Sequence, residues 1–207
     1  MTYQAQPQPT NNWAATADLT KLRQHLLDLF CQVAYKEGDF VLSSGQRSSY
    51  YINGKLVTLH PNGALAIARL LLSQLPLDTQ AVAGLTLGAD PIVSAVSVVS
   101  AIENRPIPAL IIRKEAKGHG TKAYIEGLSL PDGAIVVVLE DVVTTGQSAM
   151  KAVERLREAG YTVNQVIALV DRIQGGAELY QSAGLKFQSV FNITEIQERF
   201  QQLETGE

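Results

Sequence analysis

The stretch that decides the fold is residues 135–148, which read Ile-Val-Val-Val-Leu-Glu-Asp-Val-Val-Thr-Thr-Gly-Gln-Ser. It starts with five apolar residues, four of them β-branched, a pattern typical of a parallel strand buried on both faces. Glu140 and Asp141 then stand where such a strand should reach solvent, and small polar residues lead into a helix over 147–159. Because free N–H groups and the positive end of the helix dipole face this turn, it predicts an anion site.

Strands and helices alternate on both sides of this stretch. We expect further strands over 80–85, 108–112, 163–170 and 187–191, and further helices over 61–75, 90–103, 176–183 and 194–203. This order predicts an α/β fold with a central, mostly parallel sheet flanked by helices. Residues 61–207 would form this core, and because no interdomain linker or internal repeat is visible, we expect a single domain overall.

The residues before the core predict a smaller unit. A helix should run from about residue 18 to Lys36, ended by Gly38, and two short strands over 39–53 should form a hairpin. We interpret 18–60 as a helix plus a hood packed beside the core. Residues 1–17 are rich in Gln, Pro, Asn, Thr and Ala, and predict a disordered tail.

Composition narrows the functional classes. Hydrophobic residues make up 46% of the 207 residues and charged residues 18%. The net charge of −3 does not indicate the basic surface that nucleic-acid-binding proteins carry. We see no secretory signal, and the longest apolar-rich run, 91–102, is too short for a bilayer. The single cysteine, Cys31, cannot form an internal disulfide, which suits a reducing compartment. We therefore expect a cytoplasmic protein without nucleic-acid or membrane partners.

The polar turn at the centre of the chain favours one class of ligand. Ligands of open α/β sheets bind at the carboxyl ends of the strands. The backbone N–H groups and hydroxyls of 144–148 suit a monophosphate, whereas Glu140 and Asp141 would repel a phosphate but suit vicinal hydroxyls. A ribose 5-phosphate matches both parts of the motif, because it carries a phosphate for the turn and vicinal hydroxyls for the two acids. The alternative, a strand that simply turns into a capped helix, leaves the two adjacent acids unexplained.

Residues 136–148 resemble the phosphoribosyl-diphosphate motif of the type I phosphoribosyltransferases: an apolar run, two acids, two spacers and Thr-Thr-Gly-x-Ser. The resemblance implies the type I phosphoribosyltransferase fold and binding of phosphoribosyl diphosphate (PRPP). It implies that the acids hold the ribose hydroxyls and that the turn holds the 5-phosphate. The motif residues assigned to PRPP are Glu140, Asp141, Val142, Val143, Thr144, Thr145, Gly146, Gln147 and Ser148.

A basic loop follows the strand over 108–112. Residues 113–121 read Arg-Lys-Glu-Ala-Lys-Gly-His-Gly-Thr, which by composition alone is typical of a solvated loop. The run resembles the catalytic loop of the orotate phosphoribosyltransferases. That resemblance implies that Arg113, Lys114, Lys117 and His119 bind the diphosphate, with Lys117 as the main catalytic cation. His119 and Asp141 complete the implied catalytic set. We expect 113–131 to be a functional loop, with or without a short hairpin.

Two further segments carry the same resemblance. Residues 40–53 are similar to the family's N-terminal hood, which covers the base. Asp171-Arg172 resembles the family's Asp-Arg pair and implies that Arg172 binds the orotate carboxylate, together with Thr144. A guanidinium matches a carboxylate in bidentate geometry. The alternative for Arg172 is a surface ion pair with Asp171 or Glu178.

The loop over 85–91 falls where the family binds diphosphate through backbone amides. Asp90 could orient a metal-bound water, or cap a helix that has Pro91 at its first position. Ser43 and Leu87 stand where some relatives carry lysine, and Asn53 where many carry an acid. Lys55 either replaces a missing cation or is a solvent-exposed lysine, which we favour.

The resemblance implies an enzyme of pyrimidine biosynthesis that joins orotate to PRPP, with Mg²⁺ held mostly through substrate and water and no direct protein ligand. It also implies a homodimer whose basic loop reaches the neighbouring site. Two alternatives stay open, a phosphoribosyltransferase for another base and a PRPP-binding regulator of nucleic acid.

Overall fold

A six-stranded sheet forms the centre of the computed structural model, which describes residues 12–41, 45, 47–116 and 124–206. The strands follow the order β5 (Ile125–Glu126), β4 (Ala109–Ile112), β3 (Ala81–Leu85), β6 (Ile135–Val143), β7 (Thr162–Asp171) and β8 (Lys186–Asn192). Neighbouring strands are parallel except β4 and β5. The predicted mostly parallel α/β sheet is confirmed.

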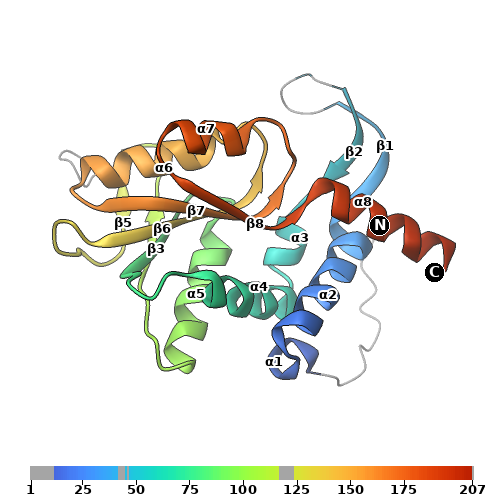
Figure 1. Cartoon of the computed structure of the whole chain (residues 1–207), viewed down its shortest axis with the longest axis horizontal. Coiled ribbons are helices and arrows are strands. Elements are labelled where there is room, and N and C mark those ends of the chain that lie inside the picture. The colour runs from blue at the N-terminus through green and yellow to red at the C-terminus, as the bar shows by residue number, and fades with distance from the viewer. Residues whose placement is uncertain (1–11, 42–44, 46, 117–123, 207) are drawn as a thin grey trace.

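Helices cover both faces of this sheet (Figure 1). On one side lie α2 (Leu19–Leu29), α4 (Pro61–Gln74) and α5 (Asp90–Ile102), and on the other α6 (Gln147–Glu158) and α7 (Gly176–Ser182). Alternate residues of β6 enter two different cores: Val137 and Leu139 one, Val136 and Val138 the other. Since successive side chains of a strand point to opposite faces, β6 is buried on both, as its apolar run predicted.

The central strand is longer than predicted. We expected it to end at Leu139, but β6 continues to Val143, with Glu140 opposite Ala168 and Val143 opposite Asp171. The adjacent carboxyl groups do not end the strand because β7 continues beside them and pairs with their backbone. Both acids are therefore held on a rigid element rather than in a loop.

The start of the chain departs from the predicted tail. Residues Trp13–Thr16 form a short helix, α1, and Ala14 is fully buried. The Ala14 carbonyl accepts a hydrogen bond of 2.8 Å from Arg69 of α4, and the Trp13 ring lies 5.2 Å from that of His25. These tertiary contacts order a segment of tail-like composition, so the prediction is wrong for 12–17. Residues 1–11 lie outside the described part.

The helix that precedes the hood ends earlier than predicted. After α2 comes one π-helical turn, η1 (Phe30–Ala34), and Tyr35 already begins β1 (Tyr35–Val41). The predicted helix to Lys36, ended by Gly38, is therefore wrong. Tyr35 is buried against the rings of Tyr50 and Phe200, with centroids 6.0 and 5.0 Å away, and its extended backbone lies opposite Ile52 in an antiparallel pair.

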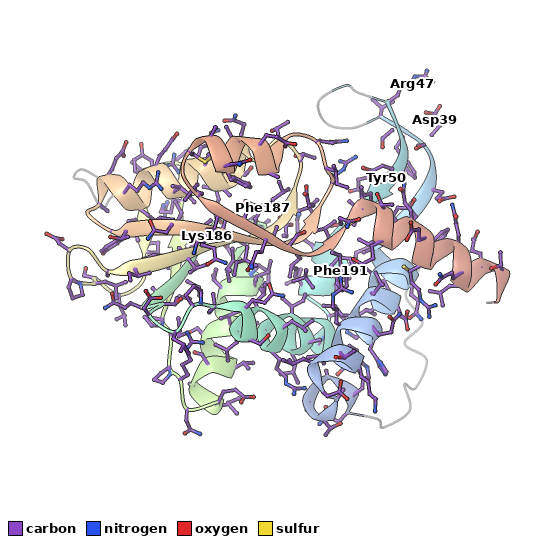
Figure 2. All side chains as sticks on the ribbon, viewed as in Figure 1. Asp39, Arg47, Tyr50, Lys186, Phe187 and Phe191 are labelled. Atoms are coloured by element: carbon purple, nitrogen blue, oxygen red, sulfur yellow. The ribbon has the colours of Figure 1, made fainter. Side chains whose placement is uncertain are left out.

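The predicted hairpin itself is confirmed. Strand β1 pairs antiparallel with β2 (Arg47–Ile52), and the pair projects beyond one end of the sheet (Figure 1). In Figure 2 Tyr50 lies toward the base of this hood, whereas Asp39 and Arg47, which form an exposed ion pair at 3.2 Å, lie toward its far end. Ser43 lies outside the described residues.

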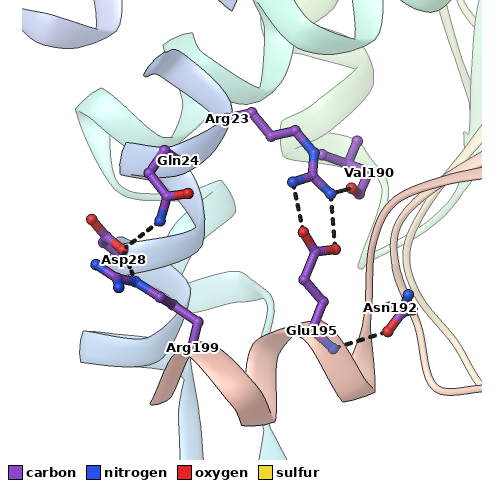
Figure 3. Close-up of polar contacts among 7 residues, drawn as sticks. All are labelled: Arg23, Gln24, Asp28, Val190, Asn192, Glu195 and Arg199. Carbon is purple, nitrogen blue, oxygen red and sulfur yellow. Dashed lines mark hydrogen bonds and ion pairs between the residues drawn. The ribbon is translucent and has the colours of Figure 1, made fainter. Parts of the chain in front are cut away.

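The C-terminal helix α8 (Ile193–Thr205) and the end of β8 bind helix α2 through polar contacts (Figure 3). Arg23 of α2 donates to both carboxylate oxygens of Glu195, at 2.6 and 2.8 Å, and to the Val190 carbonyl at 2.7 Å. Arg199 donates to Asp28 at 2.7 Å, while Asn192 caps the first turn of α8. These contacts set the position of α2, and with it the hood that follows.

The basic segment contains a hairpin. Strand β5 pairs antiparallel with β4, with Ile112 opposite Ile125. Of the two predicted forms of the loop, the one with a short hairpin is confirmed. Its centre, 117–123, includes Lys117 and His119 and lies outside the described residues. Within the described part of the chain, the structure has no helix long and apolar enough to cross a membrane.

Candidate active site

The predicted ribose-phosphate residues, except Asp141, line one cavity at the carboxyl end of β6. The cavity has a volume of about 50 Å³. Its lining consists of Glu140, Val142, Val143, Thr144, Thr145, Gly146, Gln147, Ser148 and Tyr180. The structure thus brings the first acid together with the polar turn and adds Tyr180, which our sequence analysis did not single out.

Backbone N–H groups open toward this cavity. Gly146 precedes α6 with φ of 81°, a left-handed conformation that favours glycine, and no side chain caps the helix. The first turn of α6 contains no acidic residue. The first N–H groups of α6 thus have no side-chain cap in the described structure and lie at the positive end of the helix dipole, which supports the predicted anion site without testing it.

Glu140 is buried beside this cavity, with 6% of its surface exposed. Burial, and secondarily the neighbouring charge of Asp141, raises its pKa to about 9. Its Oε2 has no hydrogen-bond partner among the described residues. At neutral pH the free protein therefore carries Glu140 in its neutral form, which relieves the repulsion between the adjacent acids.

Glu140→Gln is expected to stabilise the ligand-free protein as the pH rises. Because the native state holds this proton up to about pH 9 and the unfolded chain loses it near pH 4.3, the contribution of Glu140 to native stability is most favourable below pH 4.3 and falls between the two values. The glutamine variant lacks that loss, so its stability relative to wild type should increase by roughly 4–5 kcal/mol between pH 5 and 8.5, at about 1.4 kcal/mol per pH unit. Urea unfolding at several pH values measures the gain.

The exposed Glu154 of α6 offers a matched control. Glu154→Gln should show no such pH-dependent gain. A Glu140→Gln curve parallel to that of wild type across this range would contradict a buried, protonated Glu140.

Asp141 faces a different set of neighbours. Its Oδ1 accepts from the Val142 N–H at 2.9 Å, and its Oδ2 lies 3.9 Å from Lys55 Nζ. Lys55 begins α3 (Lys55–Thr58) and is half exposed, so it is partly the exposed lysine we favoured but is also directed at an acid of the site. A Cβ on Gly88 would lie 2.6 Å from Asp141 Oδ1, so a larger residue in the loop after β3 would displace this carboxylate.

Asp90 does not cap a helix. Ala89 occupies the N-cap position of α5, and Asp90 is its first residue, so that alternative is wrong. Asp90 Oδ2 accepts from the Thr86 hydroxyl at 2.7 Å, while its buried Oδ1 has no partner in the described structure. The hydroxyl of Thr86 fixes the carboxyl group and leaves one oxygen for another ligand.

Arg172 connects the hood to the central motif. Its backbone N–H donates to the Val143 carbonyl at 2.9 Å, and its side-chain Nε donates to the Tyr50 hydroxyl at 3.0 Å. The guanidinium also lies 4.8 Å from the centre of the Tyr50 ring, and its buried Nη2 has no partner among the described residues. The residue is only 8% exposed.

The alternative of a surface ion pair for Arg172 is therefore wrong. The described structure pairs it with neither Asp171 nor Glu178, and Asp171 instead accepts from the Ile173 N–H at 2.8 Å. Burying a guanidinium with a free donor is costly unless a ligand completes its hydrogen bonds. Arg172 is thus suited to an anionic group placed beneath the hood.

The base of the basic hairpin is held by a residue that sequence reasoning missed. Arg155 of α6 donates to the carbonyls of Arg113 and Lys114 and lies 4.0 Å from the centre of the Tyr124 ring. Arg113 forms an ion pair with Glu126 at 3.0 Å. The only sequence signal for Arg155 was a basic residue in the last turn of a helix, which many helices share.

Residues 59–202 match the family model described as the phosphoribosyl transferase domain. An orotate phosphoribosyltransferase from a Nostoc species is 80% identical over 92% of this chain and 93% of its own length. The chain belongs to the orotate phosphoribosyltransferase family. A second family member, from a Synechocystis species, is 70% identical over 90% of this chain and 94% of its own length.

A solved structure of this family is also similar. The orotate phosphoribosyltransferase of Mycobacterium tuberculosis in complex with PRPP superposes with a TM-score of 0.69 and 34% identity, over 84% of this chain and 98% of that one. The resemblance inferred from residues 136–148 and from the basic loop is confirmed at the level of family and fold. The individual roles assigned to site residues stay predictions.

Proposed function

We propose that this chain catalyses the transfer of the phosphoribosyl group from PRPP to orotate, giving orotidine 5′-monophosphate and diphosphate in pyrimidine biosynthesis. The observation that carries the proposal is the buried Arg172, which contacts both the hood and the central motif and whose Nη2 has no partner among the described residues. A base that bears a carboxylate would complete its hydrogen bonds. The orotate phosphoribosyltransferases that match nearly the whole chain support the same substrate.

The reaction breaks the bond between ribose C1 and the diphosphate oxygen and forms a bond between C1 and orotate N1. The electron pair leaves with the diphosphate, so positive charge develops on the ribose and negative charge on the leaving group. We assign the 5-phosphate to the turn over 144–148, the ribose hydroxyls to Glu140 and Asp141, and the base to Arg172 and Thr144. The protein acts by positioning, charge stabilisation and exclusion of water.

The diphosphate would be held by the basic loop. We propose that the cations of this loop approach the leaving group as it gains charge, because fixed positive groups stabilise charge that develops in the transition state. These residues are Arg113, Lys114, Lys117 and His119. Arg155 holds the base of this loop beside the last turn of α6.

The residues present fit a magnesium ion held mainly by substrate oxygens and water. Asp90, whose buried Oδ1 has no partner among the described residues, would hold a metal-bound water together with Asp141. Magnesium would supply neutralisation of the diphosphate charge.

We further propose a cytoplasmic homodimer whose basic loop contributes to the neighbouring site. The exposed apolar side chains of Val98 and Ile102, one turn apart on α5, offer a surface that a second copy would cover. Cys31, the single cysteine, is buried and free, which is compatible with a reducing compartment.

The test is the loss of orotate absorbance when PRPP and Mg²⁺ are added to the purified protein. Adenine and hypoxanthine serve as competing bases, and a nucleic-acid shift assay tests the regulator alternative. Turnover of orotate alone supports the proposal. Turnover of a purine but not orotate, or PRPP binding with no turnover of any base, would contradict it.

A further inference from the structure

Tyr180 is a buried polar group that the assigned reaction leaves unused. It lies on α7, its side chain is fully buried, and its hydroxyl has no hydrogen-bond partner in the described structure. The side chain lines the same cavity as Glu140 and the polar turn. Because a buried hydroxyl without a hydrogen-bond partner costs free energy, such a hydroxyl in the wall of a binding cavity indicates that a ligand supplies the partner.

Close packing holds Tyr180 beneath the middle of the turn. A Cβ on Gly146 would lie 3.0 Å from the Tyr180 ring and 3.1 Å from its hydroxyl oxygen. A Cβ on Gly176, at the start of α7, would lie 2.3 Å from a methyl group of Val143 and 3.1 Å from the Thr144 carbonyl. Two glycines thus let α7 approach the turn closely enough to place the hydroxyl at its underside.

The charges around this hydroxyl suit a donor to an anion. Burial, followed by the nearby Glu140 and Asp171, raises the pKa of Tyr180, so the hydroxyl keeps its proton at physiological pH. Burial also raises the pKa of Glu140 to about 9, so the carboxyl group nearest the cavity is neutral. A phosphate in the turn would therefore meet a hydroxyl donor and a neutral acid.

We propose that the Tyr180 hydroxyl donates a hydrogen bond to the 5-phosphate of the bound ribose, from below the turn formed by 144–148. The turn supplies backbone N–H groups from one side, and Tyr180 supplies a side-chain donor from the other. The phosphate identity of this ligand rests on the proposed function. The role is one of binding and positioning, because the 5-phosphate is remote from the bond that breaks.

The test is Tyr180→Phe, which removes the hydroxyl and keeps the ring. The KM for PRPP should rise about tenfold, because hydrogen bonds to charged groups are the stronger ones, while kcat and the KM for orotate stay within about twofold. The shift in melting temperature induced by ribose 5-phosphate should shrink, and that induced by diphosphate alone should not. Without ligand, the variant should melt at or above the wild-type temperature, since it loses only an unpaired group.

Tyr161→Phe is the matched control. Tyr161 is also buried, but its hydroxyl accepts from the Leu130 N–H at 3.3 Å. Its removal should lower the melting temperature of the free protein and leave the response to ribose 5-phosphate unchanged. An unchanged KM for PRPP and an unchanged ribose 5-phosphate shift in Tyr180→Phe would overturn the inference. A smaller ribose 5-phosphate shift in a protein that does not use orotate would uphold it and refute the proposed function alone.

Discussion

Arg172→Ala is expected to raise the KM for orotate about a hundredfold or more and to change the KM for PRPP by less than about threefold. The expectation follows from the loss of a buried, charge-assisted pair, worth roughly 2–5 kcal/mol when one partner is truncated. Arg172 is 8% exposed, and its Nη2 has no partner in the described structure. Steady-state kinetics with each substrate varied in turn measures the two effects separately.

Two further variants distinguish recognition of the base from general damage. Arg172→Lys keeps the charge but not the planar fork, so it should recover only a small part of the lost orotate affinity. Tyr50→Phe removes the hydroxyl that accepts from Arg172 Nε at 3.0 Å, and should raise the KM for orotate by a smaller factor. Equal increases in both KM values for Arg172→Ala, with an unchanged melting temperature, would refute the assignment of Arg172 to the base.

The sheet could be predicted because its signals are local. The β-branched run that opens 135–148 is contiguous, and the strand it predicted is buried on both faces. The predicted bounds of helices and strands that were wrong depend on residues far away in the sequence. Tyr35 begins a strand because Tyr50 and Phe200 pack against it, and Ala14 joins a helix that Arg69 holds. No window of neighbouring residues contains these contacts.

The residues of the candidate site also divide into those that a local sequence motif predicts and those that only tertiary packing places. The acids and the polar turn form one continuous motif, so the sequence predicted them together. Tyr180 and Arg155 reach the site from positions on α7 and α6 that resemble ordinary helix residues, and only the packing of those helices places them. For Arg172, the sequence left an ion pair open, and only the structure shows a buried guanidinium facing Tyr50.

Lys117→Ala is expected to lower kcat by roughly 100- to 1000-fold, the range observed when one preorganised group that stabilises transition-state charge is removed. The KM for orotate should change little, because the base binds at Arg172. Lys117 lies outside the described residues, so the prediction rests on the motif and on the loop base that Arg155 holds. Single-turnover kinetics measures the chemical step, and Lys186→Ala, at an exposed position of β8, is the control. A kcat close to wild type would remove Lys117 from the mechanism.

A mixing experiment then tests where the loop acts. Lys117→Ala and Asp141→Asn should each be nearly inactive alone. If the loop of one subunit serves the site of its neighbour, each hybrid dimer holds one site with both defects and one intact site. Random exchange should then recover about a quarter of the wild-type rate, because half of the dimers are hybrids and half of their sites are intact. If site and loop belong to the same chain, every site keeps one defect, so confirmed subunit exchange without recovered activity would refute the shared site.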